Sequence, residues 1–198
     1  MFRKKGTIMM TIGLLLLAAA LVLAGYNIYT EKQAIRFSEE VAGQLTTSIN
    51  AADKPTDYKI HPDKEMPVMN INGEYYVGIL EIPNLGLKLP VYAGPWNYDK
   101  LRNAPCLYDG SAYKDNMIIA AHNYDSFFGG IGELPQGSEI RFTDADGNIF
   151  LYETGWIEIL RPTDTEKMMN AEGWDLTLYT CTFSLTDRLT LRCCKKTL

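Results

Sequence analysis

Three side chains in this sequence could together attack a carbonyl group: the thiol of Cys181, the imidazole of His122 and the guanidinium of Arg188. Cys181 ends the β-rich run 175–181, and Arg188 begins the next such run after a six-residue connection. His122 directly follows the apolar run 116–121, so its ring should lie at the end of a strand, where it can transfer protons. The thiolate is the reactive form of cysteine, and positive neighbours favour it. The three residues therefore suggest nucleophilic acyl transfer.

Each of these residue types also has a simpler interpretation. A lone histidine on a strand is more often structural than catalytic, and a buried cysteine without activating neighbours is inert. Cys106 is interpreted as structural, because it lies in what looks like a loop that enters a turn at Asp109-Gly110. Cys193 or Cys194 could form a disulfide with Cys106 in an oxidising compartment, and the sequence leaves both pairings open.

Metals, cofactors and nucleic acids are not indicated. The formal net charge is −5, and no cluster of lysine and arginine offers a surface for nucleic-acid phosphates. The cysteines show no C-x-x-C spacing of the kind that binds zinc. The run 144–148 begins like a calcium-binding loop, but its closing glutamate is at the wrong distance, and Asp-Gly between two strand-like runs predicts a hairpin turn. His61 is interpreted as a solvated residue. We expect no metal and no cofactor.

The elements that must position the reactive residues are mostly strands. From Tyr75 onward, short β-rich runs alternate with glycine, proline, asparagine and aspartate, a pattern that predicts a closed barrel. Two helical inserts, at 98–103 and 164–171, are too short to cover a parallel sheet, so a doubly wound α/β fold is not expected. The expected strands are residues 75–82, 87–92, 116–121, 139–143, 148–160, 175–181 and 188–193.

Residues 1–30 predict a transmembrane helix. No charged side chain occurs between Gly6 and Thr30, and about 20 apolar residues span the hydrocarbon core of a bilayer. Three basic residues precede this run, so the positive-inside rule places the N-terminus in the cytoplasm and the rest of the chain outside. A cleaved signal peptide is the alternative, although its apolar stretch is usually only roughly 7 to 15 residues long.

The next segment connects this helix to the barrel. Residues 31–50 place apolar groups three to four positions apart, which predicts an amphipathic helix. Residues 51–67 are rich in Asp, Lys and Pro and resemble a linker or a loosely packed strap. We therefore divide the chain into a cytoplasmic tip and transmembrane anchor (1–30), a juxtamembrane helix and linker (31–70), and a catalytic barrel (71–198).

The last two strands distinguish the two arginines that could act with Cys181. In both runs leucines alternate with other residues, so the leucines should face the core, and Cys181, Arg188 and Arg192 should share an outer, groove-lining face. If the runs pair as an antiparallel hairpin, Arg188 lies nearly opposite Cys181. Arg192 is four residues further along, roughly 13 Å away at about 3.3 Å per residue. We expect Arg188 to act on the oxyanion and Arg192 to contribute little.

The order and spacing of these features resemble the sortases, which are cell-wall transpeptidases. The resemblance rests on Thr177-Leu178-Tyr179-Thr180-Cys181 followed by Arg188, on the earlier His122 strand, on Gly78-Ile79-Leu80-Glu81-Ile82-Pro83 and on the N-terminal anchor. It implies a mainly β fold, a closed eight-stranded barrel with short helical inserts. It also implies that Cys181 forms a thioester with a peptide sorting signal, while Arg188 stabilises the oxyanion and His122 carries the proton.

The same resemblance implies partners and a location. The substrates would be surface proteins with a C-terminal sorting motif, and the acceptor would be an amine such as a peptidoglycan precursor or a pilin lysine. Asn123, Thr180 and Thr182 flank the catalytic residues, and we expect them to contact the substrate. The protein would be a single-pass enzyme of the cell membrane, with a cytoplasmic N-terminus and an extracellular catalytic domain.

The subclass and two other functions stay open. His122-Asn123 followed by Phe127-Phe128, together with the helix before the barrel, resembles class B sortases, whereas the connection 161–174 is short for the helical insert of that class and favours an atypical class. A mainly hydrolytic cysteine peptidase and a membrane-tethered binding module without catalysis are the alternatives. A papain-like hydrolase is not indicated, because those chains place the cysteine before the histidine.

Overall fold

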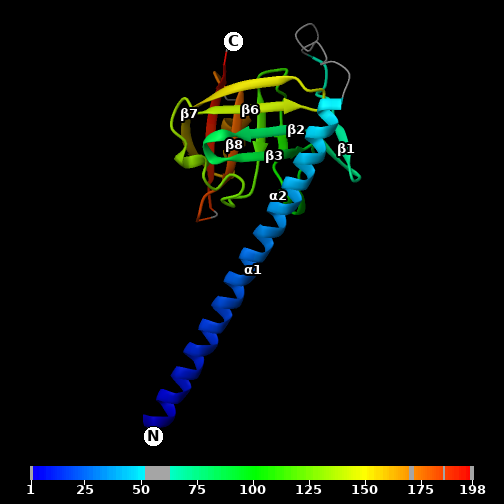
Figure 1. Ribbon diagram of the computed structural model, residues 1–198. Helices are drawn as coiled ribbons and strands as arrows, with labels where there is room; N and C mark the ends of the chain where they lie inside the picture. The colour runs from blue at the N-terminus through cyan, green and yellow to red at the C-terminus, as the bar shows by residue number, and fades with distance from the viewer. Residues whose placement is uncertain (1, 52–62, 170–171, 185, 197–198) are drawn as a thin grey trace.

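A computed structural model describes residues 2–51, 63–169, 172–184 and 186–196. His61 and most of the expected linker at 51–67 lie outside these ranges. Figure 1 shows one long helix that extends from a barrel of strands toward the N-terminus. The strands are β1 (Met69–Ile71), β2 (Glu74–Ile82), β3 (Leu87–Tyr92), β4 (Cys106–Asp109), β5 (Met117–Ala120), β6 (Glu139–Asp144), β7 (Ile149–Leu160), β8 (Leu176–Cys181) and β9 (Arg188–Lys195).

The strands form one sheet in the order β1-β2-β3-β4-β5-β8-β9-β7-β6, and a further pairing between β2 and β6 closes it. Strand β1 pairs with β2 outside this closure, so the barrel itself has eight strands. The prediction of a closed eight-stranded barrel is therefore confirmed. The helical inserts are also short, since α2 spans Tyr98–Asn103 and α3 spans Thr165–Met169, with 3-10 turns at Pro83–Leu85 and Ile131–Glu133.

Strand β4 was not predicted, and the interpretation of Cys106 as a loop residue is wrong. Cys106 pairs with Ala120 of β5 and with Tyr92 of β3, and it is fully buried. The strand is only four residues long and lies between Pro105 and the Asp109-Gly110 turn. A segment this short, flanked by residues typical of turns, carries too little alternation to identify a strand.

Helix α1 (Phe2–Ala51) joins the expected anchor and the expected amphipathic helix without a break. It includes a segment long and apolar enough to cross a membrane, none of which is buried in the protein. The second part packs on the barrel through Ala34, Val41 and Leu45, while Phe37 stacks on Tyr92 with ring centroids 6.5 Å apart. The spacing of three to four predicted this buried face, because residues so spaced share one side of a helix.

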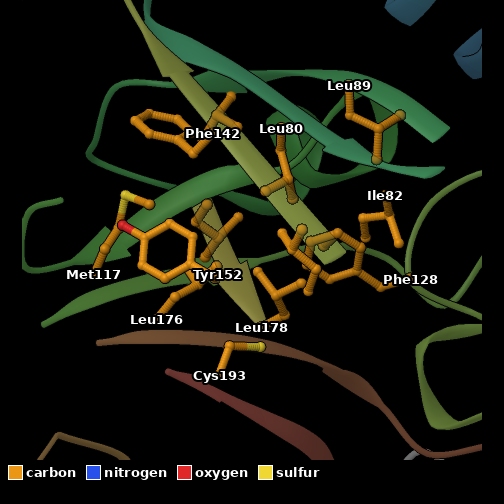
Figure 2. Close-up of a cluster of buried hydrophobic side chains, with 14 of the residues drawn as sticks. Leu80, Ile82, Leu89, Met117, Phe128, Phe142, Tyr152, Leu176, Leu178 and Cys193 are labelled. Atoms are coloured by element: carbon orange, nitrogen blue, oxygen red, sulfur yellow. The ribbon is translucent and has the colours of Figure 1, made fainter. Parts of the chain in front are cut away.

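The barrel interior is a single apolar cluster that also holds the loop after His122. Figure 2 shows inward side chains from strands on all sides of the barrel meeting at its centre. Phe127 and Phe128 belong to this cluster and are fully buried. Their burial holds the loop that follows His122 against the core. Other members drawn in the figure are Leu80, Ile82, Met117, Phe142, Tyr152, Leu176, Leu178 and Cys193.

The connection between β6 and β7 is a tight turn, as the Asp-Gly signal predicted. One carboxylate oxygen of the buried Asp144 accepts hydrogen bonds from the backbone N–H groups of Asp146 and Asn148, at 3.0 and 2.8 Å. The other oxygen accepts from the hydroxyl of Tyr113 at 2.7 Å and from the side-chain amide of Asn148 at 2.8 Å. The carboxylate thus stabilises the turn through hydrogen bonds within the protein.

Gly78 lies where β2 pairs with both β3 and β6. A Cβ atom at this position would lie 2.1 Å from the carbonyl oxygen of Thr143 on β6. Because backbone atoms cannot move aside as a flexible side chain does, we expect Gly78→Ala to lower the free energy of unfolding by about 3 kcal/mol or more. Thermal or denaturant unfolding in detergent micelles measures the change.

Gly73→Ala is the control for this prediction. Gly73 also has a positive φ, of 89°, but no atom lies within 4 Å of the position that a Cβ would take there. The substitution should cost only about 1 to 2 kcal/mol of backbone strain. Equal losses for the two variants would show that contact with β6 does not decide the effect at Gly78.

Candidate active site

The three residues identified from the sequence lie at the same end of three neighbouring strands. Strands β5 and β8 are parallel, and the N–H of Ala121 donates to the carbonyl of Tyr179 at 3.1 Å. The end of β5, which His122 follows, therefore lies beside the end of β8, which Cys181 forms. Strands β8 and β9 are antiparallel, and Cys181 is paired directly with Arg188. The expected hairpin register is confirmed. The fold therefore brings an imidazole, a thiol and a guanidinium to one edge of the barrel.

His122 is held by its neighbour in sequence and by an aromatic ring. The backbone N–H of Asn123 donates to Nδ1 of His122 at 3.0 Å, and Oδ1 of Asn123 lies 3.0 Å from the same nitrogen. A neutral ring with its proton on Nε2 accepts the first bond, and a protonated ring can donate the second. Tyr124 stacks on the imidazole with centroids 4.1 Å apart and planes inclined by 6°. Sequence reasoning missed this ring, because nothing marks Tyr124 among the twelve tyrosines.

Burial lowers the pKa of His122 below its usual 6.5. The hydrogen bond with Asn123 and the charge of Glu31 act in the opposite direction, while the charge of Arg102 adds to the lowering. Desolvation disfavours the charged imidazolium, so the neutral ring predominates at neutral pH in the free protein. The ring is thus available to accept a proton from an attacking group.

We expect Tyr124→Ala to raise the pKa of His122 toward 6.5, because the imidazole loses the ring that shields it from water. The titration curve of the His122 ring should therefore move to higher pH. NMR of the imidazole protons measures this, and the chain has only two histidines, so His61→Gln removes the other signal. Tyr124→Phe keeps the stacked ring and should leave the curve unchanged. A pKa that falls in Tyr124→Ala would contradict the assignment of burial as the cause.

Cys181 differs from the other cysteines in its surroundings. All four cysteines lie in the described part of the chain and are free thiols, so neither disulfide pairing considered from the sequence is formed. Burial raises the pKa of Cys106 to about 12 and also raises that of Cys193. Cys194 is exposed, but it pairs with Glu153 near the opposite end of β9. Cys181 is the partly exposed thiol that is paired across neighbouring strands with an arginine.

Arg188 borders a pocket on the outer face of the barrel. The pocket has a volume of about 160 Å³, and its lining includes Trp96, Tyr108, Tyr179 and Arg188. Tyr108 packs edge-to-face on Tyr179 with centroids 5.4 Å apart. Burial raises the pKa of Tyr179, and the charge of Arg188 counteracts this rise. The lining also includes Arg161, Asp164 and Thr165, so the pocket offers both aromatic and polar surface next to Arg188, which suits a peptide segment whose reacting carbonyl develops negative charge.

Arg192 does not line a groove, and this part of the prediction is wrong. It lies on the outer face as expected, but only 1% of its surface is exposed because α3 and its flanking chain cover it. Its guanidinium donates to Oε1 of Glu158 and to Oγ1 of Thr177, both at 2.8 Å. It also donates to the carbonyls of Lys167 at 2.9 Å and Met168 at 3.3 Å. Arg192 therefore fastens the β7–β8 connection to the barrel.

The three residues expected to contact substrate lie close to the site, and all three make hydrogen bonds within the protein there. Thr180 is buried, and its hydroxyl donates to the carbonyl of Ala121 at 2.9 Å, which joins the ends of β5 and β8. This burial disfavours a side-chain contact with substrate. Asn123 orients His122, as described above. Substrate contacts by these residues stay predictions.

Thr182 begins the short connection between β8 and β9, whose described residues, 182–184 and 186–187, are here called the β8–β9 loop. Its N–H donates to the carbonyl of Asp187 at 3.0 Å, which closes the loop. Its hydroxyl lies 2.9 Å from that of Ser184, which lies 2.8 Å from that of Thr186. Phe183 points outward and is 93% exposed. The loop is thus held by its own polar groups, while its aromatic side chain contacts solvent.

The barrel and its strand-end thiol define a known class of enzyme. The sequence model of the sortase domain matches residues 80–195, and the chain belongs to the sortase family. Sortases are cysteine transpeptidases of the cell surface, which is the class of activity expected from the sequence. Sortase D of Bacillus subtilis (strain 168) is 27% identical over 175 residues, which cover 86% of this chain and 87% of that protein.

Solved sortase structures share the fold. A Sortase D5 transpeptidase from Clostridium perfringens aligns with a TM-score of 0.57 and 23% identity, covering 85% of this chain and 99% of that one. Sortase C of Streptococcus pneumoniae aligns with a TM-score of 0.55 and 20% identity, covering 86% of this chain and 90% of that one. Sortase C of Clostridium perfringens, solved with a C-terminal cell wall sorting motif, aligns with a TM-score of 0.55 and 23% identity, covering 89% of this chain and all of that one. The resemblance to class B stays an interpretation.

Proposed function

We propose that the chain is a membrane-anchored transpeptidase in which Cys181 is the nucleophile, His122 the proton carrier and Arg188 the oxyanion stabiliser. The observation that carries the proposal is the direct pairing of Cys181 with Arg188 on antiparallel strands, beside the end of the strand that precedes His122. The pairing brings the two side chains to the same face at the ends of two strands, so we expect the guanidinium to reach the atoms that react at the thiol.

The first half-reaction forms a thioester. His122 takes the proton of the Cys181 thiol, the resulting thiolate attacks the carbonyl carbon of the scissile peptide bond, and the negative charge moves to the carbonyl oxygen, where Arg188 donates hydrogen bonds to it. When the tetrahedral intermediate collapses, the carbon–nitrogen bond breaks, and protonated His122 gives its proton to the leaving amine. The acyl group of the sorting motif then remains bound to the sulfur of Cys181.

The second half-reaction transfers the acyl group. An incoming amine attacks the thioester carbonyl, gives a proton to His122 and displaces the thiolate of Cys181, so a new amide forms. We propose surface proteins with a C-terminal sorting motif as donors, and a peptidoglycan precursor or a pilin lysine as the amine. The named relatives support this, since one was solved with a C-terminal cell wall sorting motif and another is described with pilin substrates.

A soluble sorting-signal peptide tests the proposed chemistry most directly. Incubation of the full chain in detergent with a panel of such peptides should give a mass increase on the peptide fragment that contains Cys181, and hydroxylamine should remove it. Transfer to an added amine separates a transpeptidase from a mainly hydrolytic peptidase, which would release the free acid. Binding without an adduct would favour a non-catalytic binding module.

The proposed location is the cell membrane, with residues 1–30 as the anchor, 31–70 as the connecting helix and linker, and 71–198 outside the cell. Charged side chains cost several kcal/mol within hydrocarbon, so the basic residues before the apolar run should stay on the side where they are synthesised. Protease added to cells stripped of their wall should therefore degrade the barrel. Complete protection of the barrel in these cells, with degradation after lysis, would reverse the orientation.

A further inference from the structure

Helix α1 leaves no flexible joint between the apolar run and the barrel. The run without charge ends at Thr30, and the next residue, Glu31, already accepts a hydrogen bond from the hydroxyl of Ser126 at 3.4 Å. Ala34, one turn later, is buried against the barrel. Because the helix is continuous from Phe2 to Ala51, the position of the membrane segment fixes the height of the barrel above the bilayer.

The helix also fixes which end of the barrel faces the membrane. Ser126, the partner of Glu31, belongs to the loop that follows His122. Ile49, near the other end of the helix, packs beside Gly147 in the β6–β7 turn. That turn precedes the part of β7 that pairs with the end of β9, whereas Leu160 at the end of β7 pairs with Arg188. The catalytic end therefore lies toward the apolar run, and the opposite end lies about 30 Å further along the helix axis.

The β8–β9 loop carries an exposed aromatic ring at this same end. Figure 1 shows the orange-to-red turn between β8 and β9 on the side of the barrel from which α1 extends toward the N-terminus. Phe183 in this loop is the most exposed of the large apolar side chains in the described residues. The hydroxyl network of the loop occupies its polar groups and leaves this ring outside. The transfer of such an exposed aromatic ring from water to an apolar environment is favourable.

The charges at this end do not select a particular lipid headgroup. Lys32 and Arg102 are exposed there, and the charge of Arg102 acts on His122. Asp125, next to Ser126, is exposed as well, and Asp187 in the β8–β9 loop and Glu31 on α1 are half-buried. Because both signs of charge occur at this end, it should be neither strongly attracted to nor strongly repelled by anionic lipids. Burial of the apolar ring should therefore dominate any contact with lipid.

We propose that the β8–β9 loop rests on the outer face of the membrane that α1 spans, with the ring of Phe183 in the interface between headgroups and acyl chains. The occupant of this exposed surface is the lipid bilayer itself. The active site then opens at the bilayer surface, so acyl donors anchored in the same membrane reach Cys181 at a defined height. The inference rests on the proposed function for its catalytic consequence, and on the geometry of α1 for the contact.

A tryptophan at the tip of the loop reports the contact without any substrate. We expect Phe183→Trp, in the full chain reconstituted in phosphatidylcholine nanodiscs, to show emission that is quenched by lipids brominated near the top of their acyl chains. Ile149→Trp is the matched control, because Ile149 is 56% exposed on β7 at the opposite end of the barrel. The emission of the parent chain, with its three native tryptophans, is subtracted. Equal quenching in the two variants would overturn the proposal. A loop tryptophan that responds to free peptide but is not quenched by the brominated lipids would overturn it as well.

A change in helix length tests the catalytic consequence. Insertion of seven polar, helix-forming residues after Thr30 lifts the barrel by about 10 Å and restores its rotation to within roughly 20°. We expect at least a tenfold loss in acylation of a sorting peptide attached to the lipid, with an unchanged rate for the same peptide free in solution. Equal rates for anchored peptide in the two proteins would overturn the inference, whereas absence of acylation of free peptide in the parent would overturn the proposed function instead.

Discussion

Replacement of Cys181 by alanine should abolish both cleavage of a sorting peptide and transfer to an amine, with a loss of about 10⁴-fold or more. No neighbouring hydroxyl can take over the attack. The hydroxyl of Thr180 is buried and bonded to Ala121, and that of Thr182 belongs to the network of the β8–β9 loop. Neither hydroxyl has the nucleophilicity of a thiolate at neutral pH. Chromatographic assay of the cleaved and transferred products measures the loss.

The other cysteines provide controls of two kinds. Cys194→Ala removes an exposed thiol far from the site and should leave the rate unchanged. Cys106→Ala removes a fully buried side chain, so it should lower the free energy of unfolding by about 1 kcal/mol or more while the folded protein keeps its activity. An active Cys181 variant together with an inactive but folded Cys106 variant would refute the assignment of the nucleophile.

Arg188→Ala should lower the acylation rate by roughly a hundredfold or more, the usual effect of losing an oxyanion donor. Arg188 is paired with Cys181 and borders the pocket of about 160 Å³, so we expect its guanidinium to reach the oxygen on which a bound carbonyl would develop charge. Arg188→Lys should restore the rate only in part, because an ammonium keeps the charge but loses the planar arrangement of donors. Single-turnover acylation rates measure both effects.

Arg192 is unsuitable as the comparison for this experiment. Its guanidinium is buried and bonded to Glu158, Thr177 and two carbonyls, so Arg192→Ala should lower the free energy of unfolding by about 3 kcal/mol or more. Arg36, exposed on α1, is the matched control for removal of a surface arginine and should change neither rate nor stability. An Arg192 variant that unfolds at the parent's temperature yet loses more acylation than Arg188→Ala would reverse the roles of the two arginines.

The sequence was most informative where a simple periodicity coincided with the fold. The helix before the barrel and the pairing of Cys181 with Arg188 followed from spacing alone, because regular elements repeat their exposure every two or 3.6 residues. Strand β4 was missed because four residues between turn signals carry no usable period. The covered position of Arg192 and the stacking of Tyr124 depend on chain segments that are distant in sequence or irregular, so no local pattern could reveal them.

The attachment of α3 through Arg192 has a consequence for attempts to redesign substrate preference. The chain around α3 borders the pocket next to Arg188, and it is fastened to β9, the strand that also carries Arg188. Exchange of the β7–β8 connection between relatives would therefore bring in a new side of the pocket without the hydrogen bonds that attach it to Arg192. A functional graft needs two backbone carbonyls where Lys167 and Met168 now present theirs, while Glu158 on β7 and Thr177 on β8 stay as partners of Arg192. The connection can be exchanged only together with the two carbonyls that accept hydrogen bonds from Arg192.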